Sequence, residues 1–260
     1  MIHPTAIVSP KARLASSVEV GAFSIIEDDV EVGERTKIAA HVILRNGARI
    51  GDDSLIDSNS VISGLPQDLG FNPEEVTYAR IGNRVTIREG STVNRSTRVG
   101  EATIVGDDCF FMAVTHVAHD CVVGNNVIIG NNTLLAGHVI VGKDTFLGGA
   151  VGVHQFCRIG EGCMLGGVTT ITKDVPPYAM AADRNRYTGL NLVGLRRRKH
   201  TREAIMSLKF CFHEMHRRMG KSSLIAEELL SHESAQTEEA RNFLTFYLSG
   251  KRGFIRPKGD

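Results

Sequence analysis

Aliphatic residues recur at every sixth position along most of this chain. The first run contains Ile2, Val8, Leu14, Val20, Ile26, Val32, Ile38, Leu44, Ile50, Ile56 and Ile62. A second run extends from Ile81 to Ile171, and every sixth residue in it is Ile, Val, Leu or Phe. A sustained six-residue period is typical of a parallel β-helix, in which each hexapeptide forms one side of a triangular coil. We therefore predict a mainly β chain built as a parallel β-helix of hexapeptide repeats.

The same period predicts which residues stack on one another. Eleven aliphatic positions in the first run and sixteen in the second, Val99 among them, predict 27 sides, or nine coils. Residues eighteen positions apart should therefore lie in one column, because three sides complete a coil. The flat faces and open ends of such a prism favour burial against further copies, so we expect a symmetric oligomer, and a threefold one suits a triangular cross-section.

The period is interrupted between Gly64 and Arg80. This stretch contains two prolines and two glycines and shows no six-residue pattern. We predict an extruded loop over about 64–80. A loop on a rigid scaffold is a natural place for substrate contacts, although a tolerated insertion without a role is the alternative.

The sixfold pattern ends near Pro176 and Pro177, and helical spacing follows. Residues 201–219 carry apolar side chains at helical intervals, and residues 224–230 and 238–248 predict two more helices, the last one opening on Thr237. We place the domain boundary after residue 190, with a β-helix domain over 1–190 and an α-helical domain over 191–260.

Composition narrows the class of protein. The net charge of +1 does not favour nucleic-acid binding. The five cysteines are odd in number and lack a CxxC spacing, which favours a reducing, cytoplasmic setting over a disulfide framework. The first ten residues do not match a signal peptide, and no apolar run approaches the ~20 residues that cross a bilayer.

Four of the ten histidines fall between residues 116 and 154. They are His116, His119, His138 and His154. Residues eighteen positions apart should lie in one column. His119, Gly137 and Gln155 therefore form one predicted column, and Asp120 and His138 form the neighbouring one. A solvated face is the plain alternative for a single histidine, but four within three coils favour a functional cluster.

This cluster predicts acyl-transfer chemistry without a covalent enzyme intermediate. Histidine is suited to act as a general base near neutral pH, and Asp120 would orient the ring of His119. Adjacent side chains diverge along a strand, so this pairing requires a corner that redirects them. Gly137 would offer a backbone N–H as an oxyanion donor. A zinc site is the rival interpretation, because neutral imidazole is the commonest metal ligand, although the longer histidine spacing of gamma-class carbonic anhydrases is not matched.

A basic patch follows the repeat. Between residues 196 and 221 there are nine Lys or Arg residues against two acids, beginning with Arg196-Arg197-Arg198-Lys199-His200. Such charge attracts an acidic partner or phosphate groups, with a solvated helix face as the alternative.

Three segments around the histidines carry a family resemblance. They are Thr115 to Cys121, Leu135 to Val139 and Val153 to Cys157. Further matches are Pro66-Gln67-Asp68-Leu69, Asp174 to Tyr178, Gly189 to Leu192, Gly194-Leu195 and Arg252-Gly253. Together they resemble the UDP-N-acetylglucosamine O-acyltransferases of lipid A biosynthesis, a family of hexapeptide-repeat acyltransferases, over essentially the whole chain.

The resemblance implies properties that the period does not reveal. It implies a left-handed β-helix and a homotrimer whose active sites lie in clefts between subunits. The reaction would move a 3-hydroxyacyl chain from acyl carrier protein to the glucosamine 3-position of UDP-N-acetylglucosamine, the first step of lipid A biosynthesis. The carrier thioester would be a co-substrate, with no cofactor, no metal, no nucleic acid and no stable membrane insertion.

The resemblance also implies a role for each matching residue. The catalytic set would be His119 as general base, Asp120 as its support and Gly137 as the oxyanion donor. The substrate-binding set would be Asp68, His116, His138, His154, Gln155, Asn191, Arg197 and Arg198. Met164 and Gly167 would measure acyl length, since a glycine at 167 leaves the acyl groove open. The remaining basic patch would dock the acidic carrier protein.

Two departures from the family pattern concern the sugar. This chain has Gly70 where many members have lysine, and Val193 where many have an acid. They keep open the same reaction on a 3-amino analogue of the sugar, which would give an amide. The N-acyltransferase of the same pathway is a further candidate, but it usually carries an additional N-terminal domain that this chain is expected to lack. An acetyl-coenzyme A-dependent acetyltransferase, a zinc hydratase and a non-catalytic scaffold also compete with the main interpretation.

Overall fold

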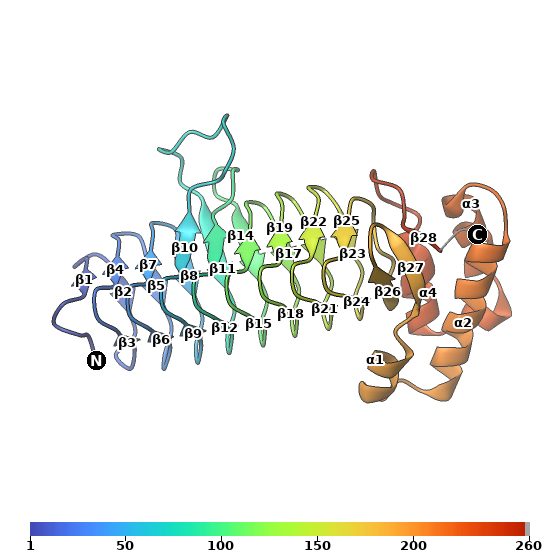
Figure 1. Ribbon diagram of the computed structural model, residues 1–260, viewed down its shortest axis with the longest axis horizontal. Coiled ribbons are helices and arrows are strands. Elements are labelled where there is room, and N and C mark those ends of the chain that lie inside the picture. The colour runs from blue at the N-terminus through green and yellow to red at the C-terminus, as the bar shows by residue number, and fades with distance from the viewer. Residues whose placement is uncertain (258–260) are drawn as a thin grey trace.

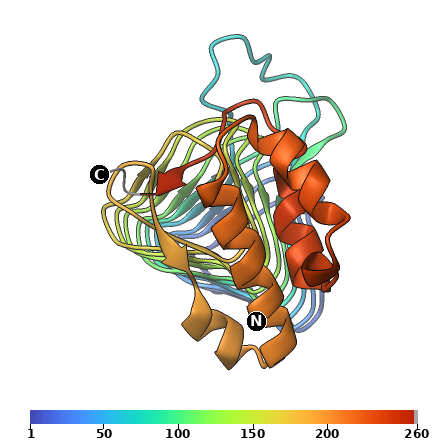
Figure 2. The same cartoon turned by 90° about the vertical axis from the view of Figure 1, so that its right-hand side faces the viewer.

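The computed structural model describes residues 1–257 and shows a triangular coil with a helical C-terminal part. Figure 1 shows the coils in sequence order from the N-terminal end, and Figure 2 shows their triangular outline with the helices covering one end. The mainly β class and the parallel β-helix predicted from the period are confirmed, as is the helical C-terminal part predicted from the helical spacing.

In the described residues the strands form three sheets, one for each side of the triangle. The first sheet contains β1 (Ile7–Val8), β4 (Ile25–Ile26), β7 (Ile43–Leu44), β10 (Val61–Gly64), β13 (Thr92–Asn94), β16 (His116–Val117), β19 (Leu134–Leu135), β22 (Gly152–Val153) and β25 (Thr170–Ile171). The second contains β2 (Arg13–Leu14), β5 (Glu31–Val32), β8 (Ala48–Ile50), β11 (Tyr78–Ile81), β14 (Ala102–Val105), β17 (Val122–Val123), β20 (Ile140–Val141) and β23 (Arg158–Ile159). The third contains β3 (Glu19–Val20), β6 (Lys37–Ile38), β9 (Leu55–Ile56), β12 (Thr86–Ile87), β15 (Phe110–Phe111), β18 (Ile128–Ile129), β21 (Phe146–Leu147), β24 (Met164–Leu165), β26 (Ala179–Ala182), β27 (Arg186–Leu190) and β28 (Arg256–Pro257).

The periodic aliphatic residues fill the interior of the coil. Val117 pairs in parallel with Leu135, and Leu135 pairs with Val153, as the count of eighteen predicts. All three are at most 3% exposed, because successive side chains of a strand alternate and the aliphatic one points inward. Burial of these columns is the main stabilising contribution to the prism.

Two loops interrupt the coils, and the sequence pattern disclosed only one of them. Ile50 pairs with Ile81, 31 residues later, so the predicted loop adds thirteen residues to an eighteen-residue coil. Ile81 pairs with Val105, 24 residues later, so a second loop between β13 and β14 adds six. Because six residues are one full repeat, the second loop does not shift the six-residue pattern, and the pattern therefore does not reveal it.

The interpretation of Val99 as a side of the coil is therefore wrong. Val99 lies in the second loop and is 67% exposed. The two loops project from the prism side by side (Figure 2), and Arg95 of the second loop donates to the carbonyl of Pro73 in the first at 2.8 Å. Its guanidinium also lies over the Phe71 ring, 5.4 Å from the ring centre.

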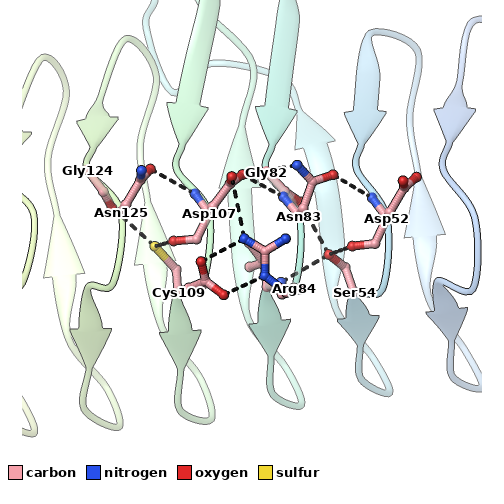
Figure 3. A network of polar contacts seen from close by, with 11 residues as sticks. Asp52, Ser54, Gly82, Asn83, Arg84, Asp107, Cys109, Gly124 and Asn125 are labelled. Atoms are coloured by element: carbon pink, nitrogen blue, oxygen red, sulfur yellow. Dashed lines mark hydrogen bonds and ion pairs between the residues drawn. The ribbon is translucent and has the colours of Figure 1, made fainter.

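A ladder of amide and carboxylate side chains keeps the coils in line across both insertions (Figure 3). The backbone N–H of Asp52 donates to Asn83 Oδ1 at 2.9 Å, although the two residues are 31 positions apart. Asn83 N–H donates in the same way to Asp107 Oδ1, and Asp107 N–H donates to Asn125 Oδ1. Each bond satisfies a corner N–H that no strand partner reaches.

The C-terminal part contains the three predicted helices together with a short helix and strands that the sequence pattern did not predict. The helices are α1 (Leu192–Arg197), α2 (Arg202–Arg217), α3 (Ser222–Leu230) and α4 (Glu238–Phe246), with a 3-10 turn at Glu233–Ala235. The predicted helices at 201–219, 224–230 and 238–248 correspond to α2, α3 and α4, and the Thr237 side chain caps α4 by accepting from the Ala240 N–H. Helix α1 and the antiparallel pair β26–β27 were missed.

The chain returns to the prism after α4. Strand β28 pairs in parallel with β27, so the end of the described chain is tied to the third sheet. Residues 258–260 of the predicted helical domain lie outside the described residues. Within residues 1–257 none of the helices has the length and apolar character that crossing a bilayer would require.

Candidate active site

His119 and Asp120 form the corner that follows β16. Asp120 has a φ of 59°, a left-handed conformation that reverses the usual divergence of adjacent side chains. The two side chains therefore converge, and His119 Nδ1 lies 2.8 Å from Asp120 Oδ2. Both are largely buried, with 11% and 7% of their side chains exposed.

The second loop holds Asp120 as a carboxylate. The Ser96 hydroxyl donates to Asp120 Oδ1 at 2.5 Å, and the Thr97 hydroxyl donates to Oδ2 at 2.6 Å. Burial acts to raise the pKa of Asp120, but the hydrogen bonds from Ser96, Thr97 and His119 outweigh it and lower the pKa to about 2. The carboxylate thus requires a proton on His119 Nδ1, which leaves the lone pair on Nε2.

Gly137 lies directly against the ring of His119, one coil further along. A Cβ at this position would lie 2.6 Å from His119 Cε1, so only glycine fits above the ring. The Gly137 N–H makes no hydrogen bond to the described residues, whereas its carbonyl accepts from the Phe156 N–H. An N–H without a partner among the described residues therefore lies beside a histidine with a free lone pair.

His138 continues the column above Asp120. Its Nε2 lies 3.6 Å from Asp120 Oδ2, and its ring meets the His119 ring edge-on. Burial lowers its pKa, and among the nearby charges that act on it are Arg98 of the second loop and Asp68 of the first. Phe156 stacks on the other face of the His138 ring at 4.6 Å. The second loop contacts this corner through Ser96 and Thr97.

The other predicted residues near the cluster differ in their surroundings. His116 Nδ1 lies 2.7 Å from the Thr92 hydroxyl, and burial lowers the pKa of His116. His154 and Gln155 are exposed on the next coil. Asp68 accepts from the Gly70 N–H at 2.8 Å, so Gly70 closes a small turn in the first loop.

A second group of predicted residues lies apart from the histidines. Met164, Asn191, Arg197 and Arg198 line a cavity of about 570 Å³ between the third sheet and α1, which Val193 also lines. None of the histidines lines this cavity. Gly167 follows at the next corner and lies against Gly149. Within one chain, the predicted substrate residues therefore lie in two separate groups, one at the histidines and one at this cavity.

Asn191 has a structural role at the start of helix α1. Its Oδ1 accepts from the Gly194 N–H and its Nδ2 donates to the Gly162 carbonyl, both at 2.9 Å. The side chain caps α1 and is buried, so both of its polar groups are engaged within the fold. The predicted nucleotide contacts of Asn191 and of Arg197 beside it stay predictions.

Part of the basic patch is neutralised. Arg217 and Arg218 form ion pairs with Glu214, and Arg218 also pairs with Glu228. By contrast, Arg196, Arg202 and Lys209 surround a surface hollow of about 700 Å³ on α1 and α2.

His119, Asp120 and His138 also have the geometry of a potential metal site. One ligand atom from each lies within 4.8 Å of the others. The Asp120 carboxylate already accepts hydrogen bonds from three side chains, so a cation would have to displace the His119 proton.

Several residues of this corner were given no role from the sequence, although two of them fall within the segments that carry the family resemblance. They are Thr92, Ser96, Thr97, Phe156 and Arg252, the last of which contacts His154. The uniformly polar residues 94–98 were the available indication of the second loop, but Val99 kept the period and concealed it.

Comparisons with known proteins agree with this geometry. A family model described as UDP N-acetylglucosamine O-acyltransferase, domain 2, matches residues 174–255, and one described as bacterial transferase hexapeptide (six repeats) matches residues 102–137. The acyl-[acyl-carrier-protein]–UDP-N-acetylglucosamine O-acyltransferase of Campylobacter lari is 42% identical, covering 97% of this chain and 95% of that protein. The protein of the same name from Neisseria meningitidis is 42% identical, with 98% and 99% covered.

Solved structures give the same result. LpxA from Acinetobacter baumannii superposes with a TM-score of 0.94 at 34% identity, covering 98% of this chain and 99% of that one. The hexapeptide coil with its buried histidine–carboxylate corner defines a hexapeptide-repeat transferase. Because the relatives match over nearly their full length, the chain belongs to the UDP-N-acetylglucosamine O-acyltransferase family.

Proposed function

We propose that this protein transfers a 3-hydroxyacyl chain from acyl carrier protein to the 3-position of the glucosamine in UDP-N-acetylglucosamine, the first step of lipid A biosynthesis. The observation that carries the proposal is the His119–Asp120 pair beneath the free N–H of Gly137. Family membership supplies the substrates, since the relatives are named for the acyl carrier protein and the UDP-sugar.

His119 is the general base in this proposal. Its Nε2 lone pair takes the proton of the sugar 3-hydroxyl while that oxygen attacks the thioester carbonyl. As the tetrahedral intermediate collapses, the carbon–sulfur bond breaks and the carrier thiol leaves with the proton from His119. Asp120 stabilises the imidazolium between these steps, because its carboxylate lies 2.8 Å from Nδ1.

Gly137 supplies the oxyanion donor. Its N–H is not engaged by the described residues and lies next to the His119 ring. A preorganised backbone donor stabilises the charge that develops on the carbonyl oxygen. Cofactor and metal chemistry have no step in this scheme.

A homotrimer completes the site. The cavity lined by Met164, Arg197 and Arg198 does not include the histidines, so a neighbouring copy would bring the two groups together. Outward apolar side chains support such packing: Ile104, Val122 and Ile140 stack in register on the second sheet and are 39–44% exposed.

The hollow at Arg196, Arg202 and Lys209 is proposed to dock the acidic carrier protein. Met164 and Gly167 stay the proposed determinants of acyl length. A cytoplasmic location is part of the proposal, and the five buried free cysteines support it because they suit a reducing compartment.

The test uses both the 3-hydroxy and the 3-amino UDP-sugar with a series of 3-hydroxyacyl carrier proteins, and the products are weighed by mass spectrometry. We expect an ester product with wild type and at least a ~10³-fold loss of turnover in His119→Ala, with an unchanged oligomeric mass. Substantial turnover by His119→Ala would refute the mechanism. An amide as the only product would show that the acceptor is the 3-amino sugar and not the 3-hydroxy sugar.

A further inference from the structure

Arg252 and His154 are 98 residues apart in sequence and in contact in the structure. Arg252 Nη2 lies 3.1 Å from His154 Nδ1. Neither the hexapeptide period nor the helical pattern relates these residues, because Arg252 follows α4 in the segment that returns to the prism (Figure 1).

This returning segment is held firmly against the last coils. The buried Asp174 carboxylate pairs with Arg158 at 2.7 Å, and Arg158 in turn donates to the Ser249 carbonyl at 2.5 Å. A Cβ at Gly250 would overlap with Arg158 Nη2, and the φ of Gly250 is +119°, so glycine is needed here. The backbone N–H of Asp174 also donates to the Gly253 carbonyl. Arg252 is thus fixed between two anchored positions.

His154 Nδ1 has two neighbours with opposite demands. Arg252 Nη2 can only donate a hydrogen bond, which requires a lone pair on Nδ1. The carbonyl oxygen of Gln155 can only accept, which requires a proton on Nδ1, and it lies at the same distance of 3.1 Å. A neutral ring can satisfy one of them. The bond from the guanidinium is charge-assisted and roughly twice as strong as a neutral one, so it prevails.

We propose that Arg252 is a positioning residue that sets the tautomer of His154, placing its proton on Nε2 so that the exposed ring presents a hydrogen-bond donor to the UDP-sugar. This rests on the proposed function for the identity of the ligand. His154 Nε2 has no hydrogen bond to residues 1–257, so its N–H is available to an oxygen of the substrate. The buried Arg252 Nε has no hydrogen-bond partner among these residues, and the same guanidinium acts on the buried Cys157 thiol, whose pKa it lowers against the effect of burial.

The tautomer can be measured without any activity. Long-range ¹H–¹⁵N spectra of histidine-labelled protein at a pH of about 8, where an ordinary imidazole is neutral, distinguish the two forms, and His154→Gln assigns the signal. We expect the Nε2–H tautomer of His154 in wild type. In Arg252→Met we expect the Nδ1–H tautomer, in which Nδ1 donates a hydrogen bond to the Gln155 carbonyl. Nδ1–H in wild type, or one tautomer in both proteins, would overturn the inference.

Kinetics test the consequence for the substrate. Arg252→Met should raise the KM for the UDP-sugar about tenfold with kcat within about twofold, the size expected when one hydrogen-bond donor is lost. The matched control is Lys251→Met, an exposed neighbour in the same segment. In a His154→Ala background the Arg252 substitution should change KM less than about twofold.

The outcomes separate the two proposals. An undiminished effect of Arg252→Met in the His154→Ala background would overturn the positioning role. An inactive wild-type protein would refute the proposed function, while the spectra would still decide the tautomer. Circular dichroism on each variant shows whether the returning segment and the fold are intact.

Discussion

The carboxylate of Asp120 turns back onto the ring of its sequence neighbour His119, 2.8 Å from Nδ1, because Asp120 has a left-handed backbone. This single corner converts two adjacent residues, which would diverge on a strand, into a base and its support. The second loop then fixes the pair through Ser96 and Thr97.

Asp120→Asn should reduce kcat by about 10²–10⁴-fold with little change in KM. The amide can donate to His119 Nδ1 and so favours the tautomer whose Nε2 carries a proton, which removes the base. Asn also tolerates the left-handed conformation, so the corner should persist. Steady-state kinetics measure the effect, and a kcat near wild type would contradict the assignment of Asp120.

The same variant should show a pH-dependent stability difference. The pKa of Asp120 is lowered from 3.8 to about 2, so its ionised form stabilises the fold above pH 3.8 and this contribution is lost as pH falls toward 2. We expect wild type to exceed Asp120→Asn by about 2 kcal/mol in the free energy of unfolding at pH 7, from roughly 1.4 kcal/mol per pKa unit. Denaturant unfolding at a series of pH values checks this, and a difference independent of pH would contradict it.

Gly137→Ala should lower kcat by about 100-fold or more. The new Cβ would lie 2.6 Å from His119 Cε1 and must displace the ring from Asp120 or from the substrate. Gly152→Ala is the matched control on the next coil, because a Cβ there meets no atom within 4 Å. Equal activities of the two variants would show that the close approach is unimportant for catalysis.

Removing the hydroxyl groups that donate hydrogen bonds to Asp120 should reduce activity, because Asp120 then holds His119 less well. Ser96→Ala and Thr97→Val each delete a hydrogen bond to the carboxylate, which typically contributes about 1.5–3 kcal/mol, so the pKa of Asp120 should rise and kcat should fall about tenfold. Thr97→Ser keeps the hydroxyl and should behave like wild type. If Thr97→Ser and Thr97→Val lose equal activity, packing rather than hydrogen bonding is responsible.

Metal chelation should leave acyl transfer unchanged, whereas added Zn²⁺ should inhibit it. The ligand atoms of His119, Asp120 and His138 lie within 4.8 Å of one another, and a cation there would displace the Nδ1 proton of His119 and break its pairing with Asp120. Activity assays after chelator treatment and elemental analysis of the purified protein provide the measurement. Stoichiometric metal whose removal abolishes activity would instead favour a metal-dependent reaction.

Charge reversal at the hollow on α1 and α2 should weaken carrier docking. The double variant Arg202→Glu/Lys209→Glu should raise the KM for the acyl carrier protein at least about tenfold at low salt, with a smaller difference at high salt. Lys11→Glu serves as the control, because it also replaces a positive charge by a negative one but lies at the opposite end of the prism, away from the hollow. An unchanged KM would move the docking site elsewhere.

The hexapeptide period by itself determined the coil and the columns of the candidate site. In a parallel β-helix the pairing register equals the sequence spacing, so His119, Gly137 and Asp120 could be related to one another by counting. The same logic concealed the second loop, because an insertion of one full repeat does not disturb the count.

Only the tertiary structure decided what surrounds these columns. Backbone handedness at a corner brought Asp120 onto His119, and the second loop brought Ser96 and Thr97 to Asp120. The return of the chain after α4 placed Arg252 on His154 across 98 residues. Such contacts depend on loop conformation and on packing between distant segments, and no local periodicity encodes them.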